Sequence, residues 1–211
     1  MNFDVARHNM VVEQLEERGI ADSRVLEAMD WVRRHEFVPG PLLSQSYDDR
    51  ALPIELEQTI SQPYTVAFMC EAARLTADDK VLEIGTGTGY CAAVLSLLTR
   101  EVHTVERLEP LYLSAAERLT RLGFRNVRCY FDDGTLGLPS EAPFNAIVCT
   151  AGAESLPEGY QKQLADGGRI VIPVGINSRQ EMIRITRCGD QFRHENLGTF
   201  GFVPLVADTE S

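Results

Sequence analysis

The stretch V-L-E-I-G-T-G-T-G-Y, residues 81–90, decides the fold class of this chain. An apolar run leads directly into three alternating glycines, Gly85, Gly87 and Gly89, and a helix-like run from Tyr90 to Leu98 follows. Glycines let a ligand approach the backbone closely, and the N–H groups that open a helix then point at it. The order of strand, glycine turn and helix predicts the first βα unit of a nucleotide-binding α/β fold.

The acids around this turn indicate which nucleotide is bound. A dinucleotide fingerprint reads G-x-G-x-x-G, whereas the third glycine here comes one residue early and Glu83 precedes the turn. A carboxylate there disfavours a pyrophosphate and suits the cationic groups of S-adenosylmethionine (AdoMet). Glu106 ends the second predicted strand, where a ribose-binding carboxylate belongs, and the third strand places Asp132 or Asp133 near the adenine.

From Lys80 onward, strand-like and helix-like segments alternate. The predicted strands are 80–84, 101–105, 127–131, 144–149 and 169–174, and the helices between them are 90–98, 110–122 and 157–164. Strands separated by helices imply a mostly parallel sheet. The runs 181–187 and 199–205 have no helix-length spacer and predict an antiparallel hairpin that closes the sheet. We therefore predict a doubly wound, seven-stranded, Rossmann-like α/β sheet.

The first fifty residues are predicted to be helical. Apolar residues recur at helical spacing over 25–32, with Asp22 or Ser23 as the N-cap, and a shorter helix ends at Gly19. Trp31 is expected to pack in the core or between helices. The predicted organisation is a helical region with an active-site loop at 1–78 and an α/β core at 79–211, together one compact domain.

Composition excludes several functions. The formal charge of −11 argues against a nucleic-acid partner and against an anionic membrane surface. The five cysteines are widely spaced without C-x-x-C, so neither a disulfide framework nor a metal site is expected. Because the N-terminus has no apolar signal segment and no run approaches transmembrane length, we expect a cytoplasmic protein.

Residues 51–64, A-L-P-I-E-L-E-Q-T-I-S-Q-P-Y, fit neither a helix nor a strand cleanly. Together with the glycine turn, D-D-G-T (132–135), P-F-N-A-I-V (143–148), L-A-D-G-G-R-I-V-I-P-V-G (164–175) and F-V-P-L (202–205), this segment resembles the protein-L-isoaspartate O-methyltransferases. The resemblance runs from residue 18 to Leu205 and is most specific in A-L-P-I and Q-T-I-S-Q-P-Y.

The resemblance implies a Rossmann-like methyltransferase sheet and AdoMet-dependent methylation of the α-carboxylate of L-isoaspartyl residues, and also of D-aspartyl residues, in damaged proteins or peptides. The methyl ester then collapses to a succinimide, which starts repair. A monomer is expected. The implied catalytic residues are Thr59 and Ser61. The implied cofactor-binding residues are Glu83, Gly85, Thr86, Gly87, Gly89, Glu106, Arg107, Asp133, Gly134, Thr59, Ile60 and Ser61, and the implied substrate-binding residues are Ile54, Thr59, Phe202 and Val203.

Two questions stay open in the sequence. Ser61 fits the active-site serine of the family, but it also fits a plain N-cap of the helix that begins near Pro63. Where the family has P-I-G-x-G, this chain has Glu55 and Glu57, so any position that needs φ > 0 carries a side chain. We expect both carboxylates to face solvent.

Three other functions compete with isoaspartyl methylation. The departures at Glu55, Glu57 and Asp132, and Asn145 in place of the family's aspartate, are compatible with a related carboxyl O-methyltransferase that has a dedicated peptide or small-acid acceptor. An AdoMet-binding module without turnover and a hydride-transferring dehydrogenase are the remaining alternatives. Arg50 is a candidate partner for a substrate carboxylate, with a solvated arginine as the simpler interpretation.

Overall fold

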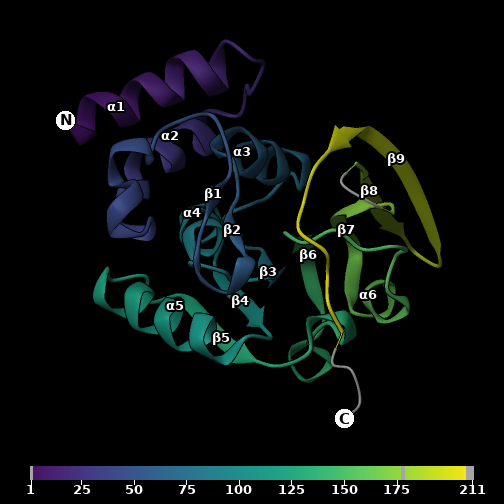
Figure 1. The fold of residues 1–211 in the computed structure, drawn as a ribbon. Coiled ribbons are helices and arrows are strands. Elements are labelled where there is room, and N and C mark those ends of the chain that lie inside the picture. The colour runs from purple at the N-terminus through teal and green to yellow at the C-terminus, as the bar shows by residue number, and fades with distance from the viewer. Residues whose placement is uncertain (1, 177–178, 208–211) are drawn as a thin grey trace.

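The computed structural model describes residues 2–176 and 179–207. Seven strands form one sheet in the order β5-β4-β3-β6-β7-β8-β9 (Figure 1). The pairs β5–β4, β4–β3, β3–β6 and β6–β7 are parallel, and the pairs β7–β8 and β8–β9 are antiparallel. The predicted doubly wound, mostly parallel, seven-stranded sheet with an N-terminal helical extension is confirmed.

The order of helices and strands along the chain agrees with the prediction. The helices are α1 (Phe3–Asn9), α2 (Ser23–Trp31), α3 (Pro63–Ala72), α4 (Tyr90–Leu98), α5 (Glu109–Arg121) and α6 (Glu158–Lys162), with a π-helical segment at Met10–Glu16. The strands are β1 (Leu52–Pro53), β2 (Thr59–Ile60), β3 (Lys80–Ile84), β4 (Glu101–Glu106), β5 (Val127–Phe131), β6 (Phe144–Cys149), β7 (Leu164–Val174), β8 (Gln180–Cys188) and β9 (Gln191–Phe200).

Successive residues of the central strands point to opposite sides of the sheet, and a separate apolar cluster covers each side. Val81 belongs to an apolar cluster that also contains Met10 and Met29 from the N-terminal helices. Its neighbour Leu82 belongs to a second cluster, which includes Tyr160 of α6. Because the first cluster joins residues from both halves of the chain, we propose that 1–78 and 79–211 form one compact domain. Within the described residues, no helix is long and apolar enough to cross a membrane.

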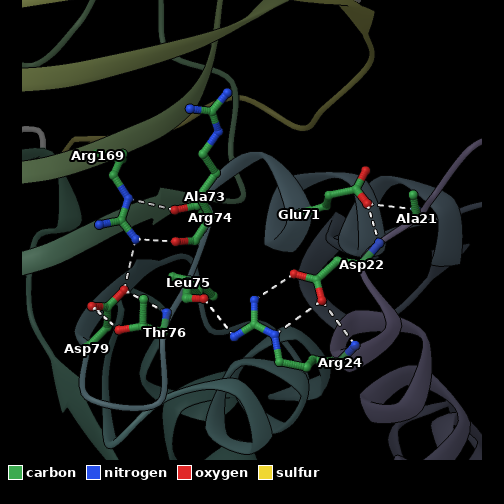
Figure 2. Close-up of polar contacts among 10 residues, drawn as sticks. All are labelled: Ala21, Asp22, Arg24, Glu71, Ala73, Arg74, Leu75, Thr76, Asp79 and Arg169. Carbon is green, nitrogen blue, oxygen red and sulfur yellow. Dashed lines mark hydrogen bonds and ion pairs between the residues drawn. The ribbon is translucent and has the colours of Figure 1, made fainter.

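A polar network fastens the helical region to the sheet (Figure 2). Arg169 of β7 donates to the carbonyl oxygens of Ala73 at 2.8 Å and Arg74 at 2.6 Å, and it pairs with Asp79 at 2.8 Å. On the other side of the same connection, Arg24 donates to the carbonyl of Leu75 at 2.9 Å. The segment between α3 and β3 is thus held from both sides, which fixes where α3 ends relative to the sheet.

The substitution Arg169→Ala is expected to lower the free energy of unfolding by about 3 kcal/mol, because it removes the cationic partner of the Asp79 carboxylate, which is only 8% exposed and would keep only its hydrogen bonds from Thr76. Chemical denaturation in urea measures this loss. Arg193→Ala is the matched control: Arg193 is 59% exposed in its pair with Glu195, so its removal should cost less than about 0.5 kcal/mol. Equal costs for the two variants would contradict the assignment of Arg169 as a buried tie.

Two predicted boundaries were wrong. The last strand was predicted at 199–205, but β9 spans Gln191–Phe200 and pairs with β8 through a tight turn, while residues 201–207 leave the sheet. The helix predicted at 157–164 is shorter, since α6 ends at Lys162 and Leu164 already begins β7. In both places apolar residues drew the prediction, whereas β9 lies at the edge of the sheet and alternates only exposed and half-buried positions.

Candidate active site

The loop that the sequence left unassigned is a small antiparallel hairpin. Leu52 lies opposite Ile60 and Pro53 opposite Thr59. At its tip, Leu56 and Glu57 have φ angles of 57° and 58°, in the left-handed region that disfavours residues with a Cβ. Glu57 therefore occupies a conformation for which the family's glycine is suited, and Glu55 does not. Both carboxylates are exposed, as expected.

Ser61 is not the N-cap of α3, so that alternative was wrong. The helix begins at Pro63, its cap residue is Gln62, and no side chain bonds to the free N–H groups of its first turn. Pro63 has no N–H that needs a partner, and the Gln62 side chain donates to Asp49 instead of capping the helix. Among the described residues, the Ser61 hydroxyl has no hydrogen-bond partner.

The glycine turn packs more tightly than a side chain would permit. Gly85 has a φ of +94°, and a Cβ built on it would lie 2.8 Å from Oγ1 of Thr150. A Cβ on Gly134 would lie 2.7 Å from Ile84. Gly87, in contrast, has open space beside its Cα, and Gly89 is an N-cap that brings no capping side chain to α4. The backbone of the turn is therefore exposed to a ligand, as a nucleotide site requires.

Glu106 ends β4 as predicted and holds the turn in place. Its Oε2 accepts from the N–H of Gly87 at 2.8 Å, and its Oε1 accepts from the N–H groups of Arg107 at 2.9 Å and Leu108 at 3.0 Å. The carboxylate is therefore fixed in position. Oε1 has both of its lone pairs in use, whereas Oε2 keeps one for a further donor. This geometry fits a ribose hydroxyl.

Glu83 lies inside the protein rather than at its surface. It is fully buried, its Oε2 accepts from Thr104 at 2.5 Å, and Thr104 in turn bonds to Thr86 at 2.6 Å. Its Oε1 has no partner among the described residues. Burial raises the pKa of Glu83 to about 8, although the bond from Thr104 acts in the opposite direction. Glu83 thus reaches the glycine turn through two threonine hydroxyls.

The raised pKa of Glu83 predicts a stability difference that depends on pH. Between pH 4.5 and 8 the unfolded chain has released this proton while the folded chain retains it, so the free energy of unfolding falls with rising pH. Glu83→Gln has no proton to retain. As the pH rises through this window, the free energy of unfolding of the variant should therefore increase relative to that of the unaltered protein, by up to about 1.4 kcal/mol per pH unit. Urea unfolding at pH 5, 6.5 and 8 measures this difference. A constant difference would show that Glu83 is ionised when folded.

The two aspartates after β5 have different surroundings. Asp133 accepts from the N–H of Thr135 at 2.9 Å and caps the short helical turn at Gly134–Leu136. Asp132 is exposed, and within the described residues its carboxylate accepts a hydrogen bond only from the N–H of Asp133. At the other departure from the family pattern, the Oδ1 of Asn145 accepts from the N–H of Lys80 at 2.9 Å, so its amide supplies an acceptor that an aspartate would also supply.

A first cavity of about 540 Å³ lies at the carboxyl ends of the parallel strands. The predicted residues in its lining are Thr59, Ile60, Ser61, Gly85, Thr86, Gly87, Glu106, Arg107, Gly134 and Val203. Five predicted residues lie outside this lining, namely Ile54, Glu83, Gly89, Asp133 and Phe202. Thr150 and Ala151 also line it and were not predicted, although their position directly after β6 is a signal that strand-end reasoning can use.

A second cavity of about 840 Å³ adjoins the first. The two linings share Thr59, Ser61, Thr150 and Val203. Phe202, predicted to bind substrate, lines the second cavity, whereas Ile54 lines neither. The two hydroxyl residues predicted to be catalytic therefore lie at the boundary where the cavities meet.

Gln180 fixes the segment at Phe202 and Val203, which forms one wall of these cavities. Its buried amide accepts from the N–H of Phe202 at 2.9 Å and donates to the carbonyl of Phe202 at 3.4 Å. Gly152 bonds to Val203 at 2.8 Å and to Leu205 at 2.7 Å, and a Cβ on Gly152 would lie 2.7 Å from Nε2 of Gln180. These contacts hold the segment after β9 beside the catalytic boundary without a strand.

Other candidate residues lie elsewhere. Arg50 pairs with Asp48 at 3.3 Å and lines neither cavity, so the solvated interpretation holds. Trp31 was expected to pack in the core or between helices, but it is 61% exposed and contacts the Phe124 ring edge-on. The five cysteines are free, and the described residues contain no cluster of His, Cys, Asp or Glu that suits a metal ion.

Comparison with known proteins places the chain in a family. The family model described as protein-L-isoaspartate(D-aspartate) O-methyltransferase (PCMT) matches residues 6–210. A protein-L-isoaspartate O-methyltransferase of Geobacter metallireducens is 51% identical over 207 residues, which is 98% of this chain and 96% of the relative. The one from Dictyoglomus thermophilum is 48% identical over 96% of this chain and 92% of the relative.

Solved structures agree with these matches. A crystallised protein-L-isoaspartate O-methyltransferase superposes with a TM-score of 0.84 at 29% identity, and the match covers 95% of this chain and 66% of that longer chain. A Plasmodium falciparum structure solved with S-adenosyl-L-homocysteine has a TM-score of 0.81 at 24% identity, with 95% and 98% covered, and supports the fold.

Proposed function

Because the chain belongs to the protein-L-isoaspartate O-methyltransferase family of AdoMet-dependent enzymes, we propose that it methylates the α-carboxylate of L-isoaspartyl residues in damaged proteins or peptides. The observation that carries this proposal is the shared boundary: Thr59 and Ser61 line both cavities at once. A donor in the first cavity and an acceptor in the second meet only at such a boundary. D-Aspartyl residues are a second class of acceptor.

We propose that the first cavity holds AdoMet. The close-packed glycines at 85 and 134 leave room only for backbone, and Oε2 of Glu106 offers an acceptor to the ribose. Arg107 and Ile60 also line this cavity, and the hydrogen bond from Gly87 to Glu106 fixes the turn. Glu83 supports the turn from below, through Thr104 and Thr86, instead of touching the ligand. When bound, AdoMet supplies a methyl group on a positively charged sulfonium.

The chain needs no strong base for this reaction. A carboxylate with a pKa near 4 is already ionised at pH 7, so residues at the boundary have only to orient it and exclude water. We propose that the hydroxyls of Ser61 and Thr59 donate to one carboxylate oxygen and leave the other free to attack. The wall formed by Phe202 and Val203 keeps water from the acceptor side.

A tritium-transfer assay tests the proposal. Paired peptides that differ only in an isoaspartyl or aspartyl linkage are incubated with methyl-tritiated AdoMet, and the expected result is labelling of the isoaspartyl peptide alone. Equal labelling of both peptides, or none of either, would contradict it. A related carboxyl methyltransferase with another acceptor is the second candidate, because Glu57, an acidic residue where the family has glycine, lines the first cavity.

We also propose that the protein is a cytoplasmic monomer that acts on proteins or peptides and does not bind nucleic acid. The net charge of −11 supports the last point, since phosphate binding requires a basic surface. Light scattering coupled to size exclusion, at a monomer mass of 23.5 kDa, checks the oligomeric state.

A further inference from the structure

The second cavity has a charge balance unlike that of the whole chain. The protein carries a net charge of −11, which repels an anionic substrate at long range. The lining of the second cavity nevertheless contains two arginines, Arg18 and Arg179, and no carboxylate. A region of positive charge therefore lies next to the boundary at Thr59 and Ser61, on the side away from the glycine turn.

Only one of the two arginines lacks an ion-pair partner among the described residues. Arg18 pairs with Asp49, and its guanidinium lies 3.8 Å from the centre of the Tyr64 ring. Among the described residues, Arg179 has neither an ion pair nor a hydrogen bond from its side chain, and it is exposed. Its guanidinium is thus the cation in this lining that is available to an incoming anion.

The backbone of Arg179 is anchored although its side chain is exposed. The next residue, Gln180, is 3% exposed, begins β8 and bonds to Phe202 in the cavity wall. The carbonyl of Arg179 lies so close to Gly175 that a Cβ there would be 3.2 Å away. The guanidinium is therefore presented from a fixed point on the rim of the second cavity.

We propose that Arg179 binds the carboxylate of the isoaspartyl acceptor and so sets the affinity for substrate. This inference rests on the proposed function. An arginine and a carboxylate form a charge-assisted hydrogen bond that neutral residues do not replace. The methyl ester has no negative charge, so the same contact is lost in the product, and Arg179 favours binding of substrate over retention of product.

The charge that Arg179 recognises disappears as the methyl group is transferred. An interaction that is stronger in the ground state than in the transition state lowers KM without raising kcat. Arg179→Gln is therefore expected to raise KM for an isoaspartyl peptide about fivefold to tenfold, with kcat unchanged or slightly higher. Arg179→Lys should retain most of the affinity, because it keeps the positive charge.

The experiment measures kcat and KM for one isoaspartyl peptide with the unaltered protein, Arg179→Gln, Arg179→Lys and the control Arg50→Gln, at 0.05 and 0.5 M NaCl. We expect salt to raise KM for the unaltered protein and to leave that of Arg179→Gln nearly constant. The affinity for S-adenosylhomocysteine, measured by calorimetry, should be equal in all four proteins.

Two outcomes would overturn the inference and are distinguishable from failure of the proposed function. A KM for Arg179→Gln within twofold of the unaltered value excludes a contact with the acceptor. A fall in kcat at constant KM assigns Arg179 a structural role instead. If the unaltered protein does not methylate the isoaspartyl peptide at all, the proposed function itself fails, and this inference fails with it.

Discussion

Replacement of Ser61 by alanine is expected to lower kcat about a hundredfold and to leave the free energy of unfolding unchanged within about 0.5 kcal/mol. Because its hydroxyl caps no helix and bonds to no described residue, its removal leaves no buried group unpaired. Because Ser61 lies at the boundary of both cavities, we expect kcat to fall through poorer orientation of the acceptor carboxylate.

Three measurements separate orientation from folding in this variant. Initial rates with an isoaspartyl peptide give kcat, urea unfolding gives stability, and calorimetry gives the affinity for S-adenosylhomocysteine, which should change less than threefold. Ser61→Thr keeps a hydroxyl and should recover part of the rate. A rate within twofold of the unaltered protein would show that Thr59 alone orients the acceptor.

Glu106→Ala is expected to weaken the binding of S-adenosylhomocysteine about a hundredfold. The carboxylate accepts three backbone N–H groups, including that of Gly87, so alanine removes both the remaining acceptor for a ribose hydroxyl and the hydrogen bond that holds the glycine turn. Hydrogen bonds to a charged group contribute about 1.5–3 kcal/mol each, which is consistent with a loss of this size.

Glu101 provides the matched control, because it lies at the opposite end of the same strand and lines neither cavity. Titration calorimetry of Glu101→Ala should give a dissociation constant close to that of the unaltered protein. Glu106→Gln keeps one acceptor and should fall between the two. If Glu106→Ala bound S-adenosylhomocysteine normally, the assignment of the first cavity to AdoMet would have to be abandoned.

The central parallel strands were predictable because they are buried on both faces and are rich in apolar residues. In β3 only Glu83 interrupts the apolar residues from Val81 to Ile84, and in β6 only Asn145 interrupts those from Phe144 to Cys149. The last strand was not predictable in the same way. β9 lies at the edge and carries Arg193, His194 and Glu195, and its alternation has no fully buried position to mark it.

The candidate site was predicted best where the backbone itself forms it. Glycines reveal a close approach, and the strand ends place Glu106 and Gly134. The complete burial of Glu83 was not predictable, because the spacing of residues shows which face of the strand a side chain lies on but not which elements cover that face. Arg179 was missed for a related reason: it belongs to no motif, and only folding brings it into the same cavity lining as Ser61.

The contact between Gly152 and Gln180 also limits how this sequence can diverge. A mutation that adds a side chain at 152 collides with the amide of Gln180, and a shorter residue at 180 releases Phe202. We expect either single change to loosen the segment at Phe202, whereas a paired change can restore its packing. Lineages should therefore keep both residues or replace both, which gives the wall of the substrate cavity an evolutionary inertia that its irregular backbone would not suggest.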